Sequence, residues 1–87
     1  MKADILRRIR DVIQTLQSEA STGALDELNR LCNDLSVMII SSSETEKGVV
    51  RSELIRLARD EATEEKIPDF HIATMAFYAL TRVITFC

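Results

Sequence analysis

The C-terminal segment, residues 69–87, constrains the fold of this chain more than any other stretch. It holds every aromatic residue of the protein and its single histidine, namely Phe70, Phe77, Tyr78, Phe86 and His71. Drawn as a helix, the segment gathers its polar residues on one stripe about 100° wide, formed by His71, Thr74, Tyr78, Thr81, Arg82 and Thr85. The rest of its surface is apolar or small. The sequence therefore predicts a strongly apolar C-terminal helix over 69–86, which other helices or a second copy of the chain must cover on most sides.

Three amphipathic helices are predicted before this segment, over residues 3–19, 24–40 and 44–65. Their apolar residues recur every three or four positions, as Ile5, Ile9, Val12, Ile13 and Leu16, then Leu25, Leu28, Cys32, Leu35 and Ile39, then Val50, Leu54, Leu57, Ala58 and Ala62. Ser21 or Thr22 can cap the second helix, Ser43 and Glu46 form a capping box for the third, and Asp69 can cap the last. Pro68 is expected to end the third helix.

The same patterns predict how deeply parts of the helices are buried. Cys32 lies on an apolar face and is expected to be a small buried side chain. The run Val37–Ile40 surrounds its helix axis with apolar residues, which predicts deep burial at that end. The third helix is expected to be the most exposed, because charged residues cover most of its circumference.

Together these segments predict one all-α domain over 1–87, either a four-helix bundle or a pair of helical hairpins. The chain has 87 residues, 46% of them hydrophobic and 29% charged, which excludes a disordered chain. Two glycines and one proline offer little turn chemistry for connecting many short strands.

Charge and composition exclude several classes of function. A net charge of −3 argues against nucleic-acid binding, because phosphate binding requires an excess of Lys and Arg. No signal peptide is expected, since Arg7 and Arg8 follow the first apolar residues at once. No membrane span is expected either, because residues 70–86 are few and include His71 and Arg82. Two cysteines without a disulfide framework favour a cytoplasmic protein.

No pattern typical of catalysis or of a metal or cofactor site is present. One histidine and two well-separated cysteines match no familiar metal-ligand spacing. No glycine-rich phosphate loop occurs, and neither Cys32 nor Cys87 has a nucleophile motif around it that would pair it with His71. We expect a protein that is not an enzyme and needs no cofactor.

Two surfaces are candidates for binding other proteins. The first is an acidic cluster around the turn before the last helix, formed by Asp60, Glu61, Glu64, Glu65, Asp69 and His71. It is either a docking patch for a basic partner or a solvated helix end, and His71 is either a pH-sensitive contact or an ordinary polar residue. The second is the surplus apolar surface of the last helix, which predicts a homodimer with an interface of Phe77, Leu80, Ile84 and Phe86.

Two family resemblances concern function. The stretch 51–60, RSELIRLARD, resembles the first helix of ribbon-helix-helix DNA-binding proteins, although no alternating strand precedes it. The chain also resembles the bacterial anti-adaptor proteins that bind the response regulator RssB, in its length, its Met1-Lys2 opening, the apolar spacing of its middle helices and Ile67-Pro68-Asp69. This second resemblance implies a stress-response regulator that acts by protein binding alone.

The predicted function is therefore a small regulatory or inhibitory protein of bacterial or phage origin that binds a protein partner. Signalling connectors, anti-adaptors, toxin-neutralising proteins and phage antagonists are of this kind. The alternatives are a structural subunit of a homo-oligomer and, less favoured, a dimeric DNA-binding regulator.

Overall fold

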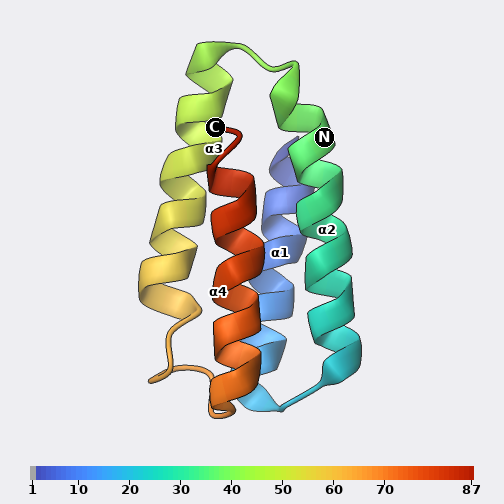
Figure 1. The fold of residues 1–87 in the computed structure, drawn as a ribbon, viewed down its shortest axis with the longest axis vertical. Helices are drawn as coiled ribbons and strands as arrows, with labels where there is room; N and C mark the ends of the chain where they lie inside the picture. The colour runs from blue at the N-terminus through green and yellow to red at the C-terminus, as the bar shows by residue number, and fades with distance from the viewer. Residues whose placement is uncertain (1) are drawn as a thin grey trace.

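The computed structural model describes residues 2–87, which form four α-helices and no strand. The helices are α1 (Lys2–Ser18), α2 (Thr22–Ile40), α3 (Glu44–Arg56) and α4 (Phe70–Ile84), and α3 continues into one turn of π-helix, η1 (Leu57–Glu61) (Figure 1). The all-α class is confirmed, and the bounds of α1, α2 and α4 agree with the predicted ones within two residues at each end.

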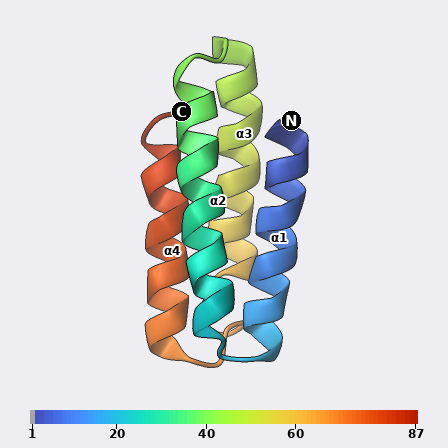
Figure 2. The same cartoon turned by 90° about the vertical axis from the view of Figure 1, so that its right-hand side faces the viewer.

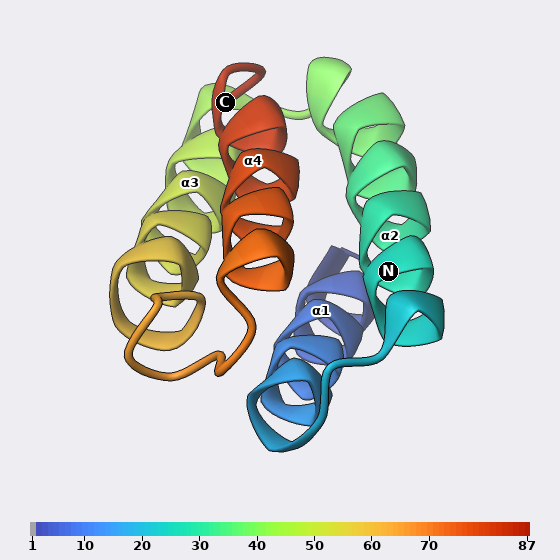
Figure 3. The same ribbon diagram turned by 60° about the horizontal axis from the view of Figure 1, so that its bottom comes forward.

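The helices form two antiparallel hairpins, α1 with α2 and α3 with α4 (Figures 1 and 2). The hairpins meet mainly through α2 and α4, which run in the same direction and pack side by side. Seen from one end, the two hairpins lie next to each other, and α4 packs between α3 and α2 (Figure 3). In consequence α4 has neighbours on two sides and leaves a further side open.

Local hydrogen bonds fix the starts of three helices, as predicted. The Ser21 hydroxyl accepts a hydrogen bond from the Ala24 N–H at 3.1 Å, and the Asp69 carboxylate accepts one from the Ile72 N–H at 3.1 Å. Ser43 and Glu46 form the expected capping box. Each cap satisfies N–H groups that a helix cannot pair internally, so short-range chemistry alone defines where these helices begin.

One hydrophobic core joins all four helices. Its largest fully buried side chains are Ile9, Ile13, Leu16, Leu28, Leu31, Leu35, Ile39, Leu54, Leu57, Ile67, Leu80 and Val83. The predicted face of the third helix, from Val50 to Ala62, is buried, and so is Cys32. The three-and-four spacing therefore identified the inward faces of the first three helices correctly.

The third helix ends earlier than predicted, at Glu61 instead of residue 65. In η1 the Ala62 N–H donates to the Leu57 carbonyl at 2.8 Å, and this wider turn brings Ala62 under Leu57, where both are buried. Acidic side chains beyond this point would meet the negative end of the helix dipole and repel one another at i, i+4 spacing. The chain turns away through 62–69 and buries Ile67 completely.

The prediction of deep burial for the end of α2 is wrong. Ile39 is buried, but Val37 and Ile40 are 72% and 60% exposed. Ile39 lies on the same face of α2 as Leu28 and Leu35, which is the seam that packs into the core. Val37 and Ile40 lie off that seam.

The last helix buries small and aliphatic residues and keeps its aromatic residues outside. Its buried residues are Ile72, Ala73, Ala76, Ala79, Leu80 and Val83, and the alanines are small enough for α4 to pack closely on its neighbours. Phe70, Phe77, Tyr78 and Phe86 are all exposed, so the chain by itself does not cover the segment on most sides. Leu80 is 0% exposed, which corrects its assignment to a dimer interface: it belongs to the core of the single chain.

Within residues 2–87 no helix has both the length and the apolar character needed to cross a membrane.

Candidate protein-binding surface

The outward side of α4 presents a concentration of apolar and aromatic surface. Phe70 is 64% exposed, Phe77 46%, Tyr78 61% and Phe86 47%. With roughly 200 Å² for each aromatic side chain, these four expose about 400 Å². These side chains do not form one patch, because Phe77 lines hollows on the α3 side of α4 whereas Phe86 lines a groove on the α2 side. Phe77 and Tyr78 share one hollow, and exposed apolar surface that gathers in this way commonly marks an interaction site.

Phe77 stands between two shallow hollows along α4. One hollow, of about 330 Å³, is lined by Ala62, Glu64, Ala73, Thr74, Phe77 and Tyr78. The other, of about 290 Å³ between α3 and α4, is lined by Ile55, Ala58, Arg59, Phe77, Thr81 and Ile84. We call the exposed surface of these two hollows the Phe77 face. Its apolar centre has a carboxylate at one edge, from Glu64, and a guanidinium at another, from Arg59.

The structure divides the predicted acidic cluster into two kinds of residue. Asp60, Glu61 and Asp69 already have partners: Asp60 pairs with Arg59 at 3.1 Å, Asp69 caps α4, and Glu61 binds the Gln17 amide. Gln17 Nε2 donates to the Glu61 carbonyl at 2.8 Å and to its Oε2 at 3.0 Å. These contacts tie the end of η1 to α1, so Glu61 has a structural role.

Glu64, Glu65 and His71 are the exposed remainder of the cluster. Within residues 2–87 none of their side chains makes a hydrogen bond or an ion pair that the structure records. Of the six predicted residues, only Glu64 lines the Phe77 face. The sequence analysis treated the acidic cluster and the aromatic residues of α4 as two separate candidate surfaces. In the structure the two surfaces adjoin at Glu64, which lines the same hollow as Phe77 and Tyr78.

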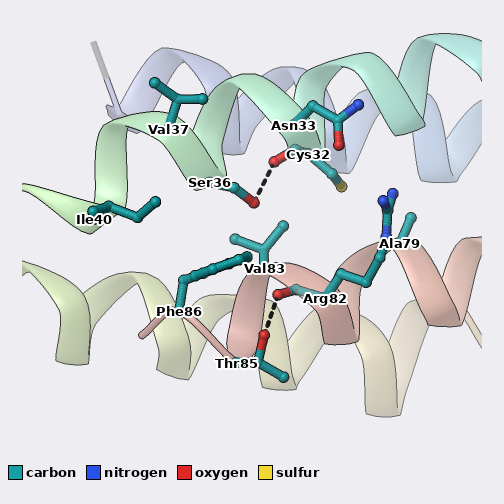
Figure 4. A pocket seen from close by; sticks show the side chains of 10 residues that line it. All are labelled: Cys32, Asn33, Ser36, Val37, Ile40, Ala79, Arg82, Val83, Thr85 and Phe86. Carbon is teal, nitrogen blue, oxygen red and sulfur yellow. Dashed lines mark hydrogen bonds between the residues drawn. The ribbon is translucent and has the colours of Figure 1, made fainter.

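A separate groove lies between the C-terminal halves of α2 and α4 (Figure 4). Its volume is about 540 Å³, and we call it the α2–α4 groove; its lining residues are Cys32, Asn33, Ser36, Val37, Ile40, Ala79, Arg82, Val83, Thr85 and Phe86. Cys32 is buried there, and this burial raises the pKa of its thiol to about 12, while the positive charge of Arg82 opposes the rise. The thiol therefore stays protonated at neutral pH and forms part of an apolar wall.

The basic residues of α1 are largely neutralised within the chain. Lys2 pairs with Glu46 at 2.9 Å, Arg7 with Asp4 at 3.2 Å and Arg8 with Glu27 at 3.7 Å. The side chains are partly exposed, so each pair adds little stability. These pairs offset part of the positive charge on this face.

Two further observations concern metal-ligating residues and the stretch 51–60. Within residues 2–87 no three His, Cys, Asp or Glu side chains lie close enough to hold a metal ion. The stretch 51–60 is helical, and the residues before it, from Glu44 onward, are helical too. The strand that precedes this helix in ribbon-helix-helix proteins is therefore replaced by helix.

Sequence reasoning missed Val37, Ile40 and Gln17. Val37 and Ile40 could have been found, because they fall off the Leu28, Leu35 and Ile39 seam and must face another direction. Gln17 carries no such signal, since its partner Glu61 is 44 positions away in the chain.

Comparisons with protein-family models, with curated proteins and with solved structures give no match for this chain. The resemblance to anti-adaptor proteins stays a hypothesis.

Proposed function

We propose that this protein is a small, non-enzymatic cytoplasmic regulator or inhibitor that acts by binding a protein partner through the Phe77 face. The observation that carries the proposal is the hollow in which Phe77 and Tyr78 lie beside Glu64. Aromatic side chains are the commonest anchors of protein interfaces. A carboxylate at the edge favours a partner whose complementary surface is basic.

The charges at the edge are expected to act mainly on the rate of encounter. Charges at the rim of an interface steer a partner of opposite sign and make association depend on salt, while the apolar centre holds the complex together. Glu64 and Glu65 are suited to this role because both are exposed. Glu61 is not, because its contacts with Gln17 stabilise the fold.

The double variant Glu64→Lys/Glu65→Lys should therefore slow association with the partner by about tenfold at low salt. The wild-type protein, immobilised and exposed to lysate, first recovers the partner for identification by mass spectrometry. Surface plasmon resonance at several salt concentrations then gives the association rates of the variants.

The matched control is Glu19→Lys/Asp34→Lys, which makes the same change of charge at two exposed acids outside the Phe77 face. It should alter the association rate much less. Equal slowing by both double variants would mean that only net charge matters and would contradict a localised acidic edge.

A second candidate function is that of a subunit in a homo-oligomer. It is favoured by the exposure of Phe77 and Phe86 and by the half-buried Ile84, all from the predicted dimer interface. Two copies could cover the outward sides of their α4 helices against each other, as closed two-fold dimers do.

This second candidate predicts a dimer mass in multi-angle light scattering at micromolar concentrations. The reason is that association would remove the exposed aromatic surface from water. A monomer mass throughout the micromolar range would reject it and leave a different protein as the partner.

A further inference from the structure

The α2–α4 groove differs chemically from the Phe77 face. Both of its wall hydroxyls have acceptors within the chain: Ser36 donates to the Cys32 carbonyl at 2.9 Å, and Thr85 donates to the Arg82 carbonyl at 2.6 Å (Figure 4). Val37, Ile40 and Phe86 are exposed at its edges. A ligand therefore meets a mainly apolar surface whose hydroxyl donors are already used.

Arg82 is the one charged residue that lines this groove. Its guanidinium donates to Asn29 Oδ1 at 3.2 Å, and within residues 2–87 it pairs with no carboxylate that the structure records. Arg82 and Cys32 both line the groove, and the positive charge of Arg82 opposes the rise that burial causes in the pKa of the Cys32 thiol. A guanidinium in such a position is suited to bidentate recognition of a carboxylate.

The dimensions of the groove fit a helix. Its α2 wall runs from Cys32 to Ile40, which at 1.5 Å per residue is about 12 Å, or roughly two helical turns. The groove is bordered by α2 and α4, which run in the same direction, and both helices contribute lining residues. Grooves of this form accept the side chains at i, i+3 or i+4, and i+7 of an amphipathic helix.

We propose that the α2–α4 groove binds an amphipathic helix of the partner, whose apolar stripe lies between Val37, Ile40 and Phe86 and which carries an Asp or Glu that pairs with Arg82. The charge complementarity of Arg82 selects this occupant. The proposal rests on the proposed function in requiring a protein partner, and it places a second contact of that partner on a surface other than the Phe77 face.

The experiment selects helices on the whole folded protein. A displayed library of amphipathic peptides, with leucine fixed at i, i+4 and i+7 and the flanking positions randomised, is selected separately on the wild type and on Arg82→Glu. Arg82 is exposed, so the variant should keep its fold, which circular dichroism checks. We expect Asp or Glu to be enriched at one flanking position on the wild type, and Lys or Arg at the same position on the variant.

Individual peptides then give the size of the effect. A peptide selected on the wild type should bind Arg82→Gln about tenfold or more weakly, and Ile40→Ser should weaken it as well. Arg30→Gln is the matched control, because Arg30 is an exposed arginine of α2 that does not line the groove. It should leave the affinity unchanged.

Four outcomes would overturn the inference. Selection of the same peptides on the wild type and on Arg82→Glu would show that no carboxylate is recognised. Peptides that depend on Phe77 and Tyr78 but not on Arg82 would place helix binding on the Phe77 face, and the proposed function would stand. Failure to enrich any peptide, or self-association that Arg82→Glu abolishes, would also remove a partner helix from the groove. The proposed function itself would then be decided by the lysate capture with Glu64→Lys/Glu65→Lys.

Discussion

Replacing Leu80 by alanine is expected to lower the free energy of unfolding by about 2–5 kcal/mol. Leu80 is 0% exposed, and truncating a fully buried leucine removes apolar contacts and leaves a cavity that the surrounding side chains fill only in part. A domain of this length has a total stability of roughly 4–13 kcal/mol. The substitution should therefore take away a large part of it and could unfold the chain near body temperature.

The matched substitution is Phe77→Ala, one turn earlier on the same helix. Phe77 is larger than Leu80 but 46% exposed, so its loss should cost about 1 kcal/mol or less. Urea unfolding followed by far-UV circular dichroism measures both variants. The assignment of Leu80 to the core would be wrong if Leu80→Ala left the unfolding curve unchanged and instead weakened a dimer.

The helix starts could be predicted from the sequence because they depend on residues that are close in the chain. Ser21, Ser43 with Glu46, and Asp69 each cap a helix through contacts only three positions away. A cap of this kind is complete within one helical turn, so tertiary packing has little influence on it.

The division of α4 into buried and exposed apolar residues could not be predicted in the same way. Leu80 and Phe77 are both apolar and lie about 60° apart around the helix, yet one is in the core and the other is exposed. Periodicity gives the direction of a side chain around its axis, but the positions of α2 and α3 decide which directions are covered. Val37 and Ile40 differ in this respect, because the spacing of Leu28, Leu35 and Ile39 already places them off the buried face of α2.

The candidate site was predicted in part. Glu64 and the aromatic residues of α4 were recognised from the sequence, but their meeting in one hollow depends on the early turn after Glu61. Glu61 and Glu64 looked equivalent as neighbouring acids. Only the contact between Gln17 and Glu61 separates a structural carboxylate from an exposed one.

The double variant Phe77→Ser/Tyr78→Ser is expected to weaken binding of the partner by at least about 30-fold. Loss of one aromatic anchor at the centre of an interface typically costs 2 kcal/mol or more, and each 1.4 kcal/mol corresponds to a factor of ten in affinity. The fold should persist because Phe77 and Tyr78 are 46% and 61% exposed and neither belongs to the hydrophobic core. The change should appear mostly in the dissociation rate, in contrast to the effect of Glu64→Lys/Glu65→Lys on association.

The most direct measurement for the Phe77 face is the dissociation constant of the complex by titration calorimetry. It compares the wild type, Phe77→Ser/Tyr78→Ser and the control Val49→Ser, in which an exposed apolar side chain is removed from α3 outside the Phe77 face. If the chain recovers only copies of itself, the same comparison is made on the dimer by dilution. We predict a loss of at least about 30-fold for the double variant and about wild-type affinity for Val49→Ser. Wild-type affinity in Phe77→Ser/Tyr78→Ser, with its fold intact, would contradict the proposal that this protein binds its partner through the outward side of α4.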